Sequence, residues 1–218
     1  MEEWRILLYP LGLLSAIAFG GRFIVQWLQS EWHQKSSVTP LFWKLSLWGN
    51  GLLALHALIQ IQFHVCFFQV CNGVIAWRNL NLMKPAVERR SFKFTCALLL
   101  ASFILTVLLF YLQSGYWFRI PITPWQLEKR EDAAFVWHLL GGTGYFLFSS
   151  RFWMQWWLAE KSLASHLSPS FWWTSIIGAS LSILYFFHIN DPVNLIGPLT
   201  GLIPYLRNLM LIRKARLS

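Results

Sequence analysis

Long apolar stretches alternate with short polar segments along the whole of this 218-residue chain. A helix needs about 20 apolar residues to cross the hydrocarbon of a bilayer, and seven stretches approach that length. The pattern therefore predicts seven transmembrane helices with brief connections, the longest over residues 114–132. The predicted segments are residues 6–28, 41–59, 64–82, 94–113, 133–158, 171–187 and 193–212.

The pattern also repeats, because one set of residues recurs 129 positions downstream without a gap. R-F-x-x-Q-W-x-x-x-E at residues 22–31 returns at 151–160, and R-N-L at 78–80 returns at 207–209. Between them, S-x-x-x-P-x-F-W-x-x-S-x-x-G occupies residues 36–49 and again 165–178. Self-similarity over this length indicates that one structural unit has been duplicated.

Each copy holds three predicted helices, so two copies joined directly would cross the membrane in opposite orientations. The segment 94–113 has no counterpart in the other copy, and this extra crossing gives both copies the same orientation. The sequence therefore predicts an all-α membrane protein of two parallel three-helix repeats plus one linker helix, a SWEET-like or PQ-loop-like arrangement. The predicted units are residues 1–83, 84–132 and 133–218.

Lysine and arginine are unequally divided between the two predicted faces. By the positive-inside rule the richer face is cytoplasmic, which puts the N-terminus outside and the C-terminus in the cytoplasm. The net charge of +9 is then mostly a topology signal, and no nucleic-acid partner is expected. The richer face carries Lys35, Lys44, Lys84, Arg89, Arg90, Lys93, Lys161, Arg213, Lys214 and Arg216, against Arg5, Arg119, Lys129 and Arg130 on the other, the last two diluted by Glu128, Glu131 and Asp132.

The composition also indicates a membrane protein, since the chain is 56% hydrophobic and 12% charged, whereas soluble domains average about 25% charged. No removable signal peptide is expected, because the N-terminus carries Glu2 and Glu3 with only Arg5, whereas a signal peptide begins with a basic region. The three cysteines fall in apolar segments and predict neither a disulfide nor a metal site. No catalytic motif is present, and the glycines at 141–144 lie in a predicted helix rather than a phosphate-binding loop. We therefore expect no catalytic residue, metal or cofactor in this chain.

Local signals mark the second helix of each copy. Thr39 and Ser168 precede prolines and are expected to cap it, while Trp43 and Trp172, one turn further on, are expected at the membrane interface. Two pairs of glycines at matching depths favour close packing of helices. These are Gly12 with Gly141 and Gly49 with Gly178.

Polar residues inside the apolar segments are the candidates for function. Arginine within a membrane helix costs about 2.5–3.5 kcal/mol at the bilayer centre, so its retention calls for an explanation. One hypothesis is a polar ring in the bundle interior that binds the anionic phosphate of a lipid head group. The alternative is that the arginines extend to the cytoplasmic surface as topology anchors, paired with Glu31 and Glu160. The candidates are Arg22, Gln26, Arg78, Asn79, Arg151, Gln155, Arg207 and Asn208.

Other polar positions give weaker signals. His56 and His138 align with tyrosines in the other copy, so they do not form a shared ligand set. Asp191 precedes a proline between two apolar segments and is expected to be an exposed turn residue.

The repeated motifs at residues 22–80 and 151–209 resemble those of the lipid A biosynthesis N-terminal domain. A doubled copy is similar to the membrane extension that precedes the catalytic part of certain bacterial lipid-A-disaccharide synthases. The resemblance covers nearly the whole chain. It departs where a cytoplasmic glycosyltransferase region would follow, since the sequence stops at Ser218. The resemblance thus implies a domain of a longer enzyme.

The resemblance implies a role at the bacterial inner membrane. Such an enzyme joins a UDP-linked diacylglucosamine to a diacylglucosamine phosphate, and the membrane domain would anchor the fused or adjacent glycosyltransferase or present these lipids to it. The implied partners are membrane lipid and the acylated glucosamine phosphate or UDP-linked precursor. A transporter or flippase of sugars or lipid-linked sugars, as the SWEET-like repeats suggest, is the alternative.

Overall fold

The computed structural model describes residues 3–33, 39–113, 117–125, 133–162 and 168–217, the side chains of 215–217 excepted. Within them the regular secondary structure is helical, apart from one isolated bridge between Gln62 and Phe118. Lys35, Ser36, Ser165 and residues 128–132, used in the sequence predictions above, lie outside the described residues. The elements are α1 (Glu3–Leu7), α2 (Pro10–His33), α3 (Pro40–Gln60), α4 (Phe63–Leu82), η1 (Ala86–Glu88), α5 (Phe92–Gln113), α6 (Phe135–Ser162), α7 (Pro169–His188) and α8 (Pro192–Leu217).

Each of the seven predicted apolar segments corresponds to one of the long helices α2 to α8, although residues 6–28 begin in α1 and residues 133–158 begin two residues before α6. By length and composition, 4 helical segments of the described chain qualify as membrane spans, namely Glu3–His33, Ala86–Gln113, Pro169–His188 and Pro192–Lys214. Helices α3, α4 and α6 are not among them. Their buried polar side chains, such as Asn50, Asn72 and Gln155, lower the mean hydropathy of these helices. Seven crossings therefore stay a prediction.

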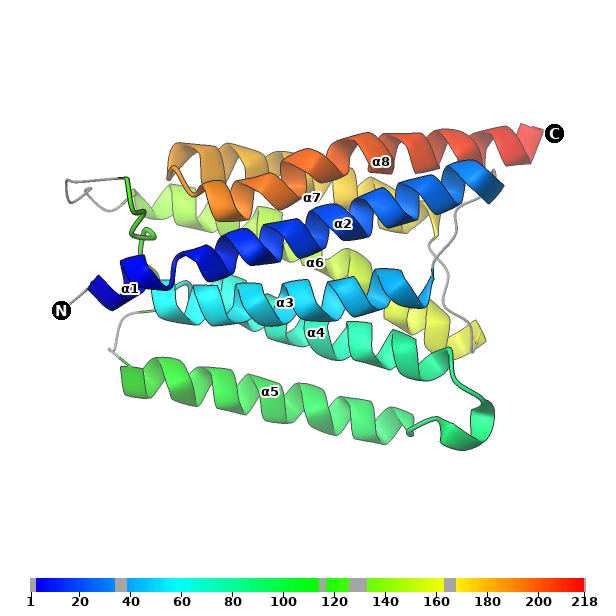
Figure 1. Ribbon diagram of the computed structural model, residues 1–218, viewed down its shortest axis with the longest axis horizontal. Helices are drawn as coiled ribbons and strands as arrows, with labels where there is room; N and C mark the ends of the chain where they lie inside the picture. Colours follow the sequence, from blue (N-terminus) through cyan, green and yellow to red (C-terminus); the bar gives the residue numbers. More distant parts are fainter. Residues whose placement is uncertain (1–2, 34–38, 114–116, 126–132, 163–167, 218) are drawn as a thin grey trace.

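Six of the long helices form a closed ring. Along the chain, α2 packs on α3, α3 on α4, α6 on α7 and α7 on α8, and the ring is completed by contacts of α4 with α6 and of α8 with α2. Helix α5 lies outside the ring against α4 (Figure 1). Successive helices run in opposite directions, and the N-terminus and C-terminus lie at opposite ends of the bundle (Figure 1). We call the end where α8 finishes the C-terminal end.

The predicted helix caps are confirmed. The side chains of Thr39 and Ser168 accept hydrogen bonds from the backbone N–H groups of Phe42 and Phe171, each at 3.4 Å, and a proline begins each helix. The turns at the other ends of α3 and α7 also correspond, because each contains a residue with positive φ at equivalent positions. These residues are Ile61 at 60° and Asn190 at 49°.

All four predicted glycines lie where helices approach closely, since a Cβ atom on Gly12 would lie 2.7 Å from the ring of His56 and one on Gly141 2.3 Å from the ring of Tyr185. A Cβ atom on Gly178 would lie 2.3 Å from the backbone nitrogen of Phe148, and one on Gly49 would lie 2.7 Å from the ring of Phe19.

Trp43 and Trp172 do not face outward, because both indoles are buried within an aromatic cluster inside the ring. Their position at the membrane interface stays a prediction. That cluster and a second one, which includes Tyr9 and Phe110, form the core.

Candidate functional site

Arg78 and Arg207 each form a bidentate ion pair with a glutamate from the other predicted repeat. Arg78 on α4 donates from Nε and Nη2 to Glu160 on α6, at 2.5 and 2.8 Å. Arg207 on α8 donates from the same two atoms to Glu31 on α2, with Nη2 at 2.9 Å. The side chains of the first pair are 4% and 12% exposed and those of the second 39% and 30%, so only the first pair is buried.

The amide side chains make a second set of equivalent contacts. Asn79 and Gln155 exchange two hydrogen bonds, at 2.9 and 2.6 Å. Gln26 and Asn208 exchange two more, at 3.0 and 3.4 Å. All four side chains are buried. Because an unpaired buried amide costs free energy, these reciprocal contacts hold the two predicted repeats together.

Arg22 and Arg151 differ from the other two arginines, since neither has a carboxylate partner among the described residues. Arg22 Nη1 donates to the hydroxyl of Ser46 at 3.3 Å, and Arg151 Nη1 donates to that of Tyr205 at 3.2 Å. The Nε atoms of both are buried with no hydrogen-bond partner. The two residues are only 3% and 2% exposed, so each is an incompletely satisfied charge within the bundle.

Aromatic rings surround both of these guanidinium groups. The Cζ atom of Arg151 lies 3.4 Å from the ring centroid of Phe148, and that of Arg22 lies 4.7 Å from the equivalent ring of Phe19. Both also lie over Phe152, at 4.7 and 5.5 Å, so the two positive charges share one neighbour. Cation–π attraction offsets part of the cost of removing the charges from water. It provides no acceptor for the N–H groups.

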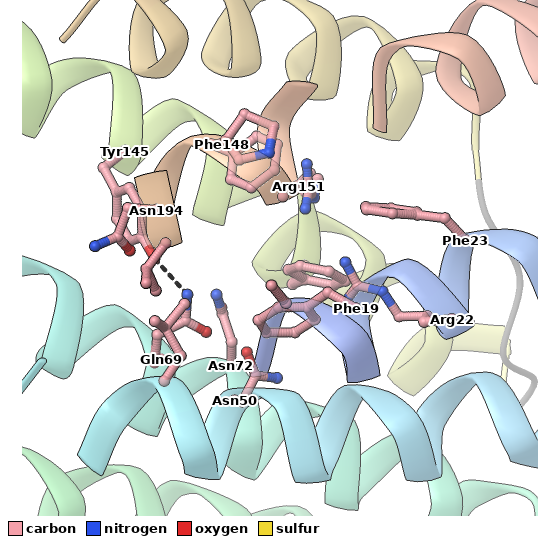
Figure 2. A pocket seen from close by; sticks show the side chains of 16 residues that line it. Phe19, Arg22, Phe23, Asn50, Gln69, Asn72, Tyr145, Phe148, Arg151 and Asn194 are labelled. Atoms are coloured by element: carbon pink, nitrogen blue, oxygen red, sulfur yellow. Dashed lines mark hydrogen bonds between the residues drawn. The ribbon is translucent and has the colours of Figure 1, made fainter. Parts of the chain in front are cut away.

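The two guanidinium groups line a cavity at the centre of the ring (Figure 2). Its volume is about 30 Å³, which is room for about two water-sized groups. Side chains from α2, α3, α4, α6 and α8 form its walls. One wall carries the amides Asn50, Gln69, Asn72 and Asn194, of which the last three have a buried carbonyl oxygen with no hydrogen-bond partner (Figure 2). The cavity therefore offers unpaired donors on one side and unpaired acceptors on the other.

The eight predicted site residues thus lie at more than one level along the bundle. Glu160 follows Arg151 by nine residues on α6, and Glu31 follows Arg22 by nine on α2. At 1.5 Å per residue this separates the ion pairs from the cavity arginines by about 13 Å. Since α2 and α6 both end at the C-terminal end, the ion pairs lie nearer that end than the cavity does (Figure 1).

Asp191 is buried, so the prediction of an exposed turn residue was wrong. Its carboxylate accepts hydrogen bonds from the Gln62 side chain at 2.8 Å and from the side chain and backbone N–H of Asn194, at 2.7 and 3.1 Å. It therefore caps the first turn of α8 and joins this helix to the turn before α4. The physical reason for its burial is this set of donors, which satisfies the charge inside the protein.

The amide wall of the cavity was missed in the sequence analysis. Asn50, Gln69 and Asn194 align with Ala179, Pro198 and Val65 in the other copy, so a search for residues shared by both copies passes over them. These residues could have been found in the sequence as amides within apolar helices. Burial of an amide costs free energy unless the amide has a hydrogen-bond partner.

The fold and the cavity define an all-helical, strongly apolar bundle with an interior basic site. The profile of the Lipid A Biosynthesis N-terminal domain matches residues 11–81 and again 140–210, and the chain belongs to this family. The two matched segments have the spacing of the motifs described above. No solved structure matches the chain.

The curated relatives that match are named lipid-A-disaccharide synthases. The protein of Chlamydia felis is 37% identical over 96% of this chain, that of Chlamydia pneumoniae 34% over 97%, and that of Chlamydia trachomatis serovar D 31% over 95%. In each case the match covers 34% of the relative, so the chain spans about a third of the length of these proteins.

Proposed function

We propose that this chain is the membrane domain of a lipid-A-disaccharide synthase-type protein of the bacterial inner membrane. It crosses the bilayer seven times, as two parallel three-helix repeats joined through α5, with a periplasmic N-terminus and a cytoplasmic C-terminus. It anchors the glycosyltransferase part at the cytoplasmic leaflet and presents an acylated glucosamine phosphate, free or UDP-linked, to it. Membership of the family and the names of the relatives support the pathway.

The positions of the basic residues support this orientation. Lys44 lies near the start of α3, Lys93 at the start of α5, Lys161 at the end of α6, and Arg213 and Lys214 near the end of α8. These helix ends all lie at the C-terminal end of the bundle (Figure 1). A cytoplasmic face of this kind agrees with the positive-inside rule.

The observation that carries the lipid-binding part of the proposal is the pair of buried guanidinium groups without carboxylates. Desolvating an unpaired charge costs several kcal/mol, and one anion between Arg22 and Arg151 would offset that cost for both. A phosphate is suited to this role, because its oxygens accept from the Nε and Nη atoms of a guanidinium group together. The unpartnered Nε atoms are the donors such a contact requires.

Reconstitution with the catalytic part of the enzyme tests this function. Residues 1–218 alone, in liposomes, are expected to form no lipid A disaccharide from the two acylated precursors. Fusion to the glycosyltransferase region should increase synthesis over that region without a membrane domain, and Arg22→Gln with Arg151→Gln should remove the increase. Equal synthesis with and without the membrane domain would contradict the proposal.

A transporter of sugars or lipid-linked sugars is the second candidate. The closed ring of six helices around a central polar cavity favours it, since ligand sites of transporters lie at the interface of their repeats. This function predicts that liposomes with residues 1–218 alone move a fluorescent acylated glucosamine phosphate between leaflets. No movement above that in protein-free liposomes would exclude it.

A further inference from the structure

A groove on the outer surface of the bundle meets the central cavity at two shared residues. Helices α3, α4 and α5 form this groove, which we call the α3–α4 groove, and its volume is about 350 Å³. Asn50 and Gln69 line both the groove and the cavity. They are almost fully buried, whereas Gly51, one residue along α3, is exposed. The two amides thus stand between the outer surface and the buried guanidinium groups.

The walls of the α3–α4 groove are apolar except at these amides. Small residues make the space, since Gly51 has no atom within 4 Å of its Cβ position and Gly73 meets only Asn50, at 3.7 Å. The remaining wall residues are hydrophobic. They are Leu47, Ala54, Val70, Val74, Trp77 and Leu98.

Three kinds of chemistry therefore follow one another from the interior to the surface: guanidinium groups, then amides, then an apolar groove. The central cavity, of about 30 Å³, has room for oxygens of a phosphate group but not for a sugar ring. The groove has the size of small-molecule sites, which begin at about 300 Å³. A lipid with a phosphate, a polar sugar and an acyl chain in that order has the complementary sequence of groups.

We infer that a phosphorylated, acylated sugar enters between α3 and α4, with its phosphate at Arg22 and Arg151 and an acyl chain in the α3–α4 groove. Asn50 and Gln69 lie beside the sugar, where the unpartnered carbonyl oxygen of Gln69 accepts from a hydroxyl or amide N–H. This inference rests on the proposed function, because it assumes the phosphate site. It adds the direction of access and the part of the protein that binds the acyl chain.

In the described part of the other predicted repeat, the equivalent positions do not offer the same chemistry. At the positions equivalent to Asn50 and Gln69 it carries Ala179 and Pro198, which offer no side-chain hydrogen bond. A larger outer groove, of about 650 Å³, is lined by α4, α6, Phe118 and Ala133. It shares no wall residue with the central cavity. An acyl chain there would not be continuous with a phosphate at the two arginines.

Two glycines provide a matched pair of variants. Gly51 in the α3–α4 groove and Gly142 in the larger groove both have nothing within 4 Å of their Cβ positions. Gly51→Leu and Gly142→Leu therefore each extend a side chain into one groove from a Cβ position that has open space. Thermal unfolding in the same detergent would establish that both variants are folded.

The probes are diacylglucosamine 1-phosphate, its deacylated form glucosamine 1-phosphate, and inorganic phosphate, with binding measured by native mass spectrometry. Gly51→Leu should weaken binding of the diacyl lipid by about tenfold, because an acyl chain displaced from the groove pulls the attached phosphate from the arginines. It should leave binding of the two chain-free probes unchanged. Gly142→Leu should leave all three unchanged.

The outcomes separate failure of the groove from failure of the phosphate site. Equal affinities of Gly51→Leu and the unchanged chain for the diacyl lipid, or a loss only in Gly142→Leu, would overturn the groove while leaving the phosphate site intact. Unchanged binding of all three probes in Arg22→Gln/Arg151→Gln would overturn the site itself. If Gly51→Leu does not fold, a diazirine on the acyl chain of the same lipid should label peptides containing Val74 or Leu98, and labelling confined to α6 would overturn the inference.

Discussion

The arginines at two levels along this bundle differ in their partners. At the C-terminal end, Arg78 and Arg207 are each held by a glutamate from the other predicted repeat. About 13 Å further in, Arg22 and Arg151 lie among aromatic rings with only hydroxyl partners in the described part of the chain. The arginines of the first level are neutralised by carboxylates of the protein, whereas those of the second level have N–H donors without an acceptor. A buried charge is thus informative only together with its partners.

The largest effect we expect on stability comes from breaking the buried ion pair. Glu160→Gln leaves Arg78 without its carboxylate in a site where the pair is 4% and 12% exposed, and should destabilise the protein by about 3–5 kcal/mol. The equivalent change, Glu31→Gln, should cost much less, because that pair is 39% and 30% exposed and water screens it. Chemical unfolding of both variants in detergent would measure the difference. Equal losses would show that burial does not distinguish the pairs.

Replacement of the arginines by methionine should change stability in opposite directions at the two levels. Arg151→Met removes a buried charge that has no carboxylate, and should stabilise the ligand-free protein by about 1–3 kcal/mol. Arg78→Met leaves Glu160 unpaired and should destabilise it. The measurement is again unfolding without added lipid. Destabilisation by Arg151→Met would mean that its contacts with Phe148 and Tyr205 outweigh the desolvation of its charge.

A smaller effect is expected from the amide contacts between the levels. Gln155→Leu removes both hydrogen bonds that Gln155 and Asn79 exchange and should cost about 1–3 kcal/mol. Gln155→Leu combined with Asn79→Leu should recover part of this loss, since both polar side chains of the contact are then replaced by apolar ones. A double-mutant cycle measures the coupling. Additive losses would argue against a direct contact.

The last expected effect is confined to acid pH and is the dependence of stability on pH at Glu160. Burial raises the pKa of this carboxyl. Hydrogen bonds from Arg78 and Trp156 and the charge of Arg78 together lower the pKa by more than burial raises it, so the folded pKa lies below its usual value. The contribution of the pair is complete above the pKa of an unfolded glutamate, about 4.3, and is lost as the pH falls through the lower folded value. Melting temperatures at a series of pH values should show this loss in the unchanged chain. In Glu160→Gln the loss from this group should be absent.

Much of the helical framework could be predicted from the sequence, because hydrophobic runs, N-caps and glycine pairs are local features. The contacts between helices could not. The sequence offered Glu31 and Glu160 as partners of the arginines, but it did not show that they would pair with Arg207 and Arg78 rather than with Arg22 and Arg151, since this depends on which helices complete the ring. Asp191 was misjudged partly for the same reason, because one of its donors, Gln62, comes from the turn before α4. The search for shared residues found the arginines but passed over Asn50 and Gln69, which have no polar counterpart.

The central claim is that Arg22 and Arg151 bind the phosphate of an acylated sugar. The most direct test is the affinity of the chain, in detergent, for diacylglucosamine 1-phosphate and for the same lipid without its phosphate, with and without Arg22→Gln/Arg151→Gln. We expect the unchanged chain to prefer the phosphorylated lipid by about tenfold or more, as charge-assisted hydrogen bonds of about 1.5–3 kcal/mol imply, and the variant to lose this preference. A preference of the same size in both proteins would contradict the claim.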